Sequence, residues 1–366
     1  RREPALNRPP AATPMEHDQR HTEGTRNMPS QEENEQLLET LSREGVLINI
    51  SVRYWRAAKK LTPEDLGLDQ QAIASDLISL GHKKLLKKDA LRPFSLIESR
   101  AHALIEANTF PFLGGLGHFL PNAKLEEVTA RLDGLEQEFT EARDTFVSNY
   151  ADVREEALRE WGNVAASLEG DPERLLGTIH ASFPRRDQVY DLFRFSTYLF
   201  QVVAPQQLSL ELVTAGDQLA VSQARERAAA RAAERIRAGA EGFITDCVAS
   251  LRQQTAQLCD EMLKSMQSGT SGVHQRTLNR LVRFIDQFKS MNFTGDRQME
   301  EQLDQVRREF LSRSAEEYRD DAFARERLQS GLQDLAKTAT DLAHQDSRDL
   351  VGQFGKMGQR RFHLAA

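Results

Sequence analysis

Cysteine, proline and glycine are scarce in this chain of 366 residues, and long apolar runs are absent. Two cysteines exclude the dense disulfide framework of small secreted domains, and 12 prolines with 21 glycines exclude a collagen-like chain. No run of about 18 uninterrupted apolar residues occurs, which excludes a membrane-spanning helix. Aromatic residues make up 7% of the chain and charged residues 28%, which is typical of elongated helices rather than of one thick core.

Acidic residues outnumber basic ones, 55 against 48, which gives a formal net charge of -7. This balance argues against a protein whose whole surface binds nucleic acid, although local basic patches remain compatible with it. The first residues contain no apolar run of about 7 to 15 residues behind a basic start, so no secretory signal is indicated. We therefore expect a cytoplasmic protein.

Two segments of different composition make up the first third of the chain. Scattered prolines among polar residues predict a disordered tail over residues 1–34. Residues 35–122 predict a compact N-terminal α(+β) module, with helices over 35–44, 70–80 and 94–107. Residues 46–55 alternate in polarity and predict a strand with Ile48, Ile50, Val52 and Tyr54 on one side and Leu47, Asn49, Ser51, Arg53 and Trp55 on the other.

The segment 110–121 combines three glycines with three phenylalanines. Glycine-rich loops can bind phosphates, but such loops lie between a strand and a helix start that carries Lys and Ser or Thr, and this segment lacks that context. A tight turn that docks its phenylalanine rings in a core is the favoured interpretation. His118 could act as a base, yet it has no nucleophile or carboxylate at a meaningful spacing.

Residues 123–205 predict a helical arm with an aromatic cluster. Apolar residues recur every three or four positions from Leu125 to Trp161, which predicts one long amphipathic helix that packs on a partner helix, with a shift of register near Asn149. Asp171 followed by Pro172 marks the start of another helix, because Asp caps helices well and Pro suits their first position.

The aromatic stretch over residues 183–200 fits either a strand or a helix. Its rings lie near Arg185, Arg186 and Arg194 in the sequence, so they could stack the bases of a single-stranded nucleic acid. Packing of the N-terminal module against the helical arm explains the same rings with fewer assumptions and is favoured.

Residues 206–345 predict a long helical hairpin or coiled coil. Residues 207–268 contain no proline and indicate one very long helix, and the Gly-, Ser- and Thr-rich residues 268–272 would reverse the chain. Helices over 273–291 and 297–343 would then run back along it. Residues 346–366 predict a flexible C-terminal tail. The expected fold class is mainly α, a small α(+β) N-terminal module followed by long antiparallel helical hairpins.

Two basic segments are candidates for docking an anionic partner. Residues 82–88 hold four lysines, and residues 224–238 hold five arginines against two glutamates on an alanine-rich helix. A solvated basic edge with Leu85 and Leu86 turned inward is the favoured alternative for the first segment, and a thin coiled-coil stalk for the second. The candidate docking residues are Lys83, Lys84, Lys87, Lys88, Arg225, Arg227, Arg231 and Arg235.

Motifs of catalysis and metal binding are missing from the sequence. HExxH, GxSxG and P-loop motifs do not occur, and no set of His, Cys and carboxylates has the spacing of a zinc site. Cys247 and Cys259 lie about 18 Å apart on one expected helix, beyond disulfide reach, so we expect small buried thiols in a reducing compartment. The sequence thus predicts no catalytic, cofactor-binding or metal-binding residue and no cofactor.

Three stretches carry a family resemblance: INISVRYWRAAKKLTPEDLGL, LISLGHKKLLKKDALRPFSLIESRAHALIE and FPFLGGLGHFLPNAKLEEV. They resemble a domain-of-unknown-function family of bacteria, phages and integrative elements. Members of that family are often encoded beside a MoxR or cobaltochelatase-type AAA+ ATPase and a von Willebrand factor A-like protein. The resemblance is strongest over residues 45–130. It implies a class of partner and transfers no catalytic residue.

We expect a non-enzymatic helical adaptor or regulatory subunit that works with a MoxR-type AAA+ ATPase in a bacterial or mobile-element system. The von Willebrand factor A-like protein is a second expected partner, and no membrane partner is expected. One alternative is a nucleic-acid-associated protein of a phage or integrative element, whose phosphate contacts would come from residues 82–88, 224–238 and 360–361. The other is a structural coiled coil that forms homo-oligomers.

Overall fold

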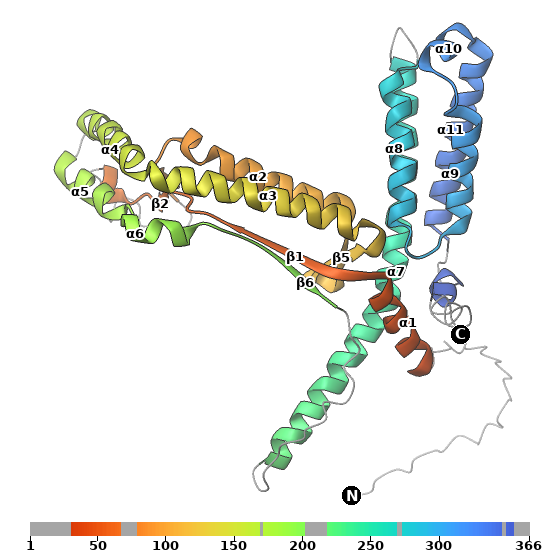
Figure 1. The fold of residues 1–366 in the computed structure, drawn as a ribbon, viewed down its shortest axis with the longest axis horizontal. Coiled ribbons are helices and arrows are strands. Elements are labelled where there is room, and N and C mark those ends of the chain that lie inside the picture. Colours follow the sequence, from red (N-terminus) through yellow and green to blue (C-terminus); the bar gives the residue numbers. More distant parts are fainter. Residues whose placement is uncertain are drawn as a thin grey trace, which may run out of the picture.

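The chain forms two elongated parts that meet at an antiparallel sheet. The computed structural model describes residues 31–66, 79–168, 171–201, 218–268, 273–345 and 349–354. Figure 1 shows helices α2 to α6 extending to one side of the sheet, here named the arm. The second half of α7 stands with α8 to α11 on the other side, here named the bundle. A mainly α fold with a small β component is confirmed.

The described strands all belong to the first part of the chain. They are β1 (Gly45–Arg53), β2 (Ala58–Lys60), β3 (His82–Lys84), β4 (Phe110–Phe112), β5 (Gly117–Pro121) and β6 (Arg194–Phe200). Short 3-10 turns lie next to these strands in the chain, namely η1 (Pro63–Leu66), η3 (Lys88–Leu91), η4 (Leu113–Gly115) and η5 (Tyr190–Leu192).

The helices lie before, between and after these strands. In the first half they are α1 (Gln31–Glu44), α2 (Arg92–Asn108), α3 (Asn122–Ser148), α4 (Tyr150–Ser167), α5 (Pro172–Ser182) and α6 (Arg186–Val189). In the second half they are α7 (Gln218–Ser268), α8 (Gln275–Met291), α9 (Arg297–Phe310), α10 (Ala315–Asp320) and α11 (Ala322–Ala343). The helix expected over residues 70–80 lies almost wholly outside the described residues.

Four strands pair in the order β4-β5-β1-β6, and every pairing is antiparallel. The strand expected over 46–55 is confirmed as β1, which pairs with β5 on one side and with β6 on the other. The register of β1 against β6 runs from Leu47 opposite Phe200 to Arg53 opposite Arg194. The aromatic segment that fitted either a strand or a helix therefore contains a strand, while β2 and β3 form a separate hairpin.

The arm follows its sequence pattern closely. The chain leaves helical geometry at Asn149 (φ -93°, ψ 5°), between α3 and α4, where the apolar register shifts. The side chain of Asp171 accepts a hydrogen bond from the backbone N–H of Arg174 and caps α5, with Pro172 in the first turn. The predicted start of α5 is thus confirmed, whereas the single long helix expected from Leu125 to Trp161 is divided into α3 and α4 at the predicted register shift.

One hydrophobic core joins the N-terminal module to the arm. The Phe94 ring of α2 contacts the rings of Tyr54, Phe139, Phe146 and Phe193, with centroids 4.7 to 6.1 Å apart. These rings come from the residue after β1, from α2 and α3, and from the residue before β6. The boundary expected at 122–123 consequently lies inside a shared core, in keeping with the packing interpretation of the aromatic segment.

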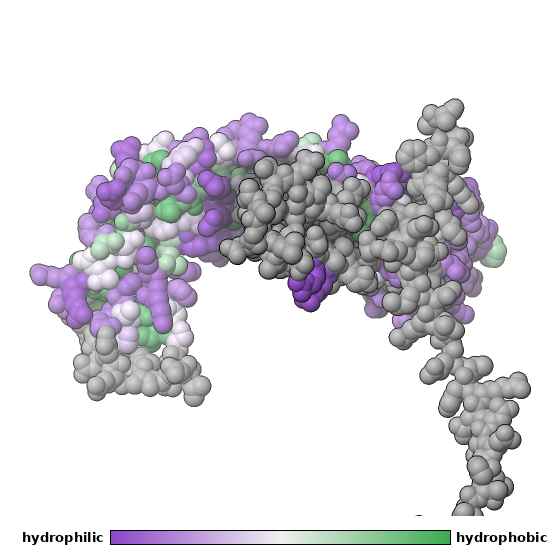
Figure 2. All heavy atoms as spheres, turned by 90° about the horizontal axis from the view of Figure 1, so that it is seen from below, coloured by the Kyte–Doolittle hydropathy of each residue, from purple (hydrophilic) through white to green (hydrophobic). Residues whose placement is uncertain are grey.

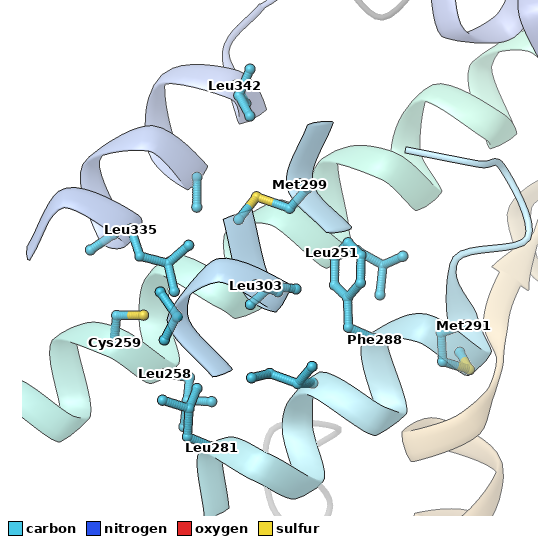
Figure 3. Packing of buried hydrophobic residues seen from close by; sticks show 14 of the residues in the cluster. Leu251, Leu258, Cys259, Leu281, Phe288, Met291, Met299, Leu303, Leu335 and Leu342 are labelled. Atoms are coloured by element: carbon cyan, nitrogen blue, oxygen red, sulfur yellow. The ribbon is translucent and has the colours of Figure 1, made fainter. Parts of the chain in front are cut away.

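A second core fills the bundle, whose consecutive long helices alternate in direction (Figure 1). Figure 3 shows leucine, methionine and phenylalanine side chains from α7, α8, α9 and α11 converging between the helices. The predicted hairpin is therefore a bundle in which four long helices share one core. The helix expected over 297–343 is divided, because Ser314 forms a capping box with Glu317 and Asp321 caps α11.

A buried ion pair ties three helices of the bundle together. Arg252 on α7 donates from Nε to Asp296 Oδ2 at 2.6 Å, and its side chain also donates to the carbonyl oxygen of Leu342 at 2.6 Å. Asp296 in turn accepts a hydrogen bond from the backbone N–H of Met299 at the start of α9. Both charged side chains are at most 5% exposed, so each depends on the other.

A group of phenylalanine rings, here named the junction cluster, joins the sheet to the bundle. The rings of Phe112 and Phe119 lie 4.9 and 5.4 Å from that of Phe243 on α7, and the Phe119 ring lies 4.7 Å from that of Phe293. The predicted role of the glycine-rich turn, docking its rings in a core, is confirmed. The members of the junction cluster are Phe110, Phe112, Phe119, Phe243, Phe293 and Phe354.

The two ends of the chain differ in part from expectation. Residues 349–354 are helical, and Phe354 is fully buried with its ring 5.8 Å from that of Phe293. The flexible tail expected over 346–366 is therefore wrong for this stretch, because an apolar ring docks in the junction cluster. The disordered tail expected over 1–34 lies outside the described residues except for the first turn of α1. Among the helices described, none is both long and apolar enough to cross a bilayer.

Candidate functional site

The lysines of segment 82–88 differ in how far they are buried and paired with carboxylates of the same chain. Lys83 is 6% exposed, and its Nζ lies 2.6 Å from both carboxylate oxygens of Asp65. An anionic partner cannot reach this ammonium, so the structure removes Lys83 from the predicted docking residues. Burial alone raises the pKa of Asp65, but hydrogen bonds from Lys83 and Thr62 outweigh it and lower that pKa below its usual value.

Other residues of this segment contact α4 through ion pairs and a hydrogen bond. Lys87 forms ion pairs with Glu160 and with Glu156, at 2.9 Å for the latter, and the hydrogen bonds to Glu160 and Glu156 raise the pKa of Lys87. The indole Nε1 of Trp161 donates to the backbone carbonyl of Lys84 at 3.2 Å. Lys84 and Lys88 are exposed, and Leu85 and Leu86 are buried as the basic-edge interpretation predicts.

The candidate arginines of α7 lie away from these lysines. Arg227 and Arg231 are exposed, while the side chains of Arg225 and Arg235 lie outside the described part of the structure. Figure 1 shows the first half of α7 projecting away from both the arm and the bundle, whereas the lysine segment lies near α4. The fold does not bring the two basic segments onto one surface, and residues 360–361 are not described.

A different pair of arginines meets on the sheet. Arg53 at the end of β1 lies directly opposite Arg194 at the start of β6, and directly opposed residues project from the same face. The intervening pair is Ser51 and Ser196. Both arginines are exposed, and neither forms an ion pair with any described residue. This face, opposite the one that Phe195 packs into the arm core, is here named the outer face.

A cavity of about 590 Å³ opens at the arginine end of the outer face. Arg56 also lines it but is occupied, because it donates to Glu98 Oε1 at 2.6 Å and lies over the Tyr54 ring at 3.9 Å. The hydrogen bond to Glu98 raises the pKa of Arg56. The lining residues are Val52, Arg53, Tyr54, Trp55, Arg56, Asp191, Leu192 and Arg194.

Two aromatic rings lie at the other end of the outer face. Tyr198 and Phe200 follow Arg194 at positions that point to the same side of β6, and they are 48% and 50% exposed. Their ring planes are 22° apart, with centroids separated by 6.4 Å. Sequence reasoning weighed Arg194 and the aromatic segment together but did not single out Arg53. The alternation of polarity over 46–55 already assigns Arg53 to the side away from the core, yet its partner strand cannot be read from it.

An apolar groove of about 540 Å³ runs between α2 and α3 on the arm. Its floor includes Phe94, Ile97 and Ala142, and Leu96 beside them is 52% exposed. Arg100 at the rim donates two hydrogen bonds to Glu138 at 2.5 and 3.0 Å. Figure 2, which views the molecule from below, shows small apolar areas interrupting an otherwise hydrophilic described surface on the arm.

Other residues of types that can carry catalysis, one histidine and two cysteines, contact or lie among residues of the fold. His118 Nδ1 lies 3.2 Å from the hydroxyl oxygen of Thr109, with no acidic partner among its described hydrogen bonds. Cys247 and Cys259 are free and buried in the bundle, which raises the pKa of both thiols, that of Cys259 to about 12. Across the described residues, no three His, Cys, Asp or Glu side chains gather closely enough to hold a metal ion.

A comparison with known proteins identifies a family whose model covers the part of the chain that holds most of these features. A search of curated proteins and a search of solved structures found no match. The family model described as "Protein of unknown function (DUF3150)" matches residues 43–242, more than half of the chain. The matched stretch contains the arm, the outer face and the first half of α7, and it ends where α7 enters the bundle. The chain therefore belongs to the DUF3150 family.

Proposed function

We propose that this protein is a non-enzymatic helical adaptor or regulatory subunit that works with a MoxR-type AAA+ ATPase in a bacterial or mobile-element system. The ATPase and a von Willebrand factor A-like protein are the partners that the sequence resemblance implies. In this proposal, the groove between α2 and α3 binds an amphipathic helix of the ATPase.

The apolar groove is the observation that carries the proposal. Leu96 leaves about half of its surface in water beside buried Phe94 and Ile97, so a partner helix that covers it removes apolar surface from solvent. Among the described lining residues, Glu138 and Glu141 border the groove together with one arginine, Arg100, and so favour a helix with basic flanks. Helix-in-groove recognition needs a preformed apolar channel of this kind.

A rigid connection between the arm and the bundle suits an adaptor. The junction cluster contacts both the sheet and the bundle, and Gly239 of α7 lies so close to Leu113 that a Cβ at this position would clash with the Leu113 side chain. A partner bound to the arm would therefore be held at a set position relative to anything bound to the bundle.

Affinity capture from the native host tests the proposal. We expect tagged wild-type protein to recover the AAA+ ATPase, and Leu96→Glu to lose it, because burying a carboxylate in an apolar groove is strongly unfavourable. Phe323→Glu is the matched control, since Phe323 is 70% exposed on α11, outside the groove. Recovery of no ATPase by the wild type, or equal recovery by both variants, would contradict the proposal.

A further inference from the structure

We infer that the outer face of the β1–β6 ribbon binds single-stranded nucleic acid, with phosphates on Arg53 and Arg194 and bases stacked on Tyr198 and Phe200. This inference does not depend on the adaptor proposal, because the outer face and the groove between α2 and α3 use different residues.

The positive charge at the arginine end of the outer face favours the binding of an anion. Like charges placed directly opposite each other on an antiparallel pair destabilise the sheet. Arg56 next to them is neutralised by Glu98, but Arg53 and Arg194 have no ion-pair partner among the described residues. Among the described residues that line the cavity, Asp191 is the single carboxylate, against three arginines. Phosphates bound one to each guanidinium group would turn the repulsion into attraction.

The aromatic end of the outer face offers exposed rings on which nucleic-acid bases can stack. Tyr198 and Phe200 leave about half of their surface in water, unlike Phe193 and Phe195 of the same segment, which are at most 6% exposed. Exposed rings on a strand offer stacking platforms for unpaired bases, and this stacking tolerates any sequence. A double helix cannot use such a platform, because its bases already stack on one another.

The distance between the arginine end and the aromatic end of the outer face suits a short single strand. Arg53 opposite Arg194 and Asn49 opposite Tyr198 are four residues apart along the ribbon, which is about 13 Å at strand geometry. The hydroxyl groups of Ser51 and Ser196 lie between them and can donate to phosphate or sugar oxygens. A short single strand lying along β6 can thus contact arginines, hydroxyls and rings in succession.

A peptide strand is the competing occupant, because β6 lies at the edge of the sheet that the described strands form. Edge pairing would use the backbone groups of β6 and would leave the arginines and the rings of the outer face without a role. The paired cations and exposed rings match phosphates and bases instead, so nucleic acid is the occupant we assign.

Fluorescence anisotropy of the full chain with labelled oligonucleotides of about 20 nucleotides tests the inference. We expect oligo-dT and oligo-U to bind at low salt, and a duplex of the same length to bind at least tenfold more weakly. Binding should weaken steeply with salt, as phosphate contacts require. Absence of binding by both single strands, or tighter binding of the duplex, would overturn the inference.

Charge variants locate the site. The double change Arg53→Gln and Arg194→Gln should reduce the slope of log affinity against log salt by about 1.4, since each phosphate contact contributes roughly 0.7 for single strands. The control is Arg227→Gln with Arg231→Gln, which removes the same charge from α7. A loss confined to the α7 variant would overturn the assignment of the outer face.

Ring variants separate stacking from charge. Tyr198→Ala and Phe200→Ala should each weaken binding by roughly tenfold and leave the salt slope unchanged. No variant should unfold at a lower temperature than the wild type, because both rings are half exposed and the removal of Arg53 and Arg194 relieves repulsion. Unaltered affinity in both ring variants, or competition by an extended peptide in place of an oligonucleotide, would refute base stacking.

Discussion

Removing one partner of the Arg252–Asp296 pair should open the bundle while the arm stays folded. Asp296→Asn keeps the shape of the side chain and an oxygen able to cap α9, but it leaves the Arg252 guanidinium buried with the Leu342 carbonyl as its remaining partner. Breaking a buried pair from one side costs about 3 to 5 kcal/mol. We therefore expect the unfolding free energy of the bundle to fall by about 3 kcal/mol.

The chain carries separate reporters for its two parts. Cys247 and Cys259 lie in the bundle core, where burial raises their pKa and shields them from thiol reagents. Trp55 and Trp161, the two tryptophans of the chain, pack against the arm core. Thiol labelling under native conditions thus measures opening of the bundle, and tryptophan emission in urea measures unfolding of the arm.

A loss of about 3 kcal/mol corresponds to labelling roughly 100-fold faster in Asp296→Asn, at tenfold per 1.4 kcal/mol. The double variant Arg252→Met with Asp296→Asn should recover part of this loss, because no unpaired charge stays buried. The urea midpoint of tryptophan emission should stay unchanged. If labelling rises less than threefold, or if the double variant loses the sum of both single effects, the pair does not hold the bundle in the way described.

Further predictions concern a close helix contact and the buried lysine. Gly331→Ala should destabilise the bundle by about 1 kcal/mol, because the new methyl group meets the ring of Phe310, whereas Gly134→Ala has open space and should stabilise α3 by up to about 1 kcal/mol. Circular dichroism during urea unfolding compares them, and an equal gain for both would contradict the clash. The pKa of Asp65 is lowered in the folded state, so the stability it contributes is complete above its unfolded pKa of about 3.9 and is lost as the pH falls through the lower folded value. The difference in unfolding free energy between the wild type and Asp65→Asn should therefore shrink below about pH 4, and a difference that stays constant down to pH 2 would show that the charge paired with Lys83 is not its source.

Local signals in the sequence predicted local structure well. Alternation identified β1, Asp171 with Pro172 identified the start of α5, and the register shift marked Asn149, where the expected long helix divides into α3 and α4. Each of these features depends on residues within a few positions of one another, so side-chain periodicity and capping chemistry suffice to predict them.

Partners far apart in the sequence were the part that could not be predicted. A stripe of apolar residues shows that a helix has a buried face but not which helix covers it, so four helices with one core were expected to form a hairpin. Lys83 resembles its neighbours in sequence, and its burial depends on Asp65 of η1, in the connection between β2 and β3, folding against it. The outer face requires the register that places Arg53 opposite Arg194, which polarity patterns do not contain.

Because α7 is continuous, its number of residues between the sheet and the bundle sets the rotation of the bundle about the helix axis. This helix of 51 residues is about 75 Å long, and it passes the sheet near Gly239 before Phe243 enters the junction cluster. Each residue added between the sheet contact and the bundle would rotate the bundle by about 100° about the helix axis. Insertions of about seven residues, close to two full turns, would restore the facing sides and lengthen the helix by about 10 Å. We therefore expect the length of α7 between the sheet contact and the bundle to change only in whole turns.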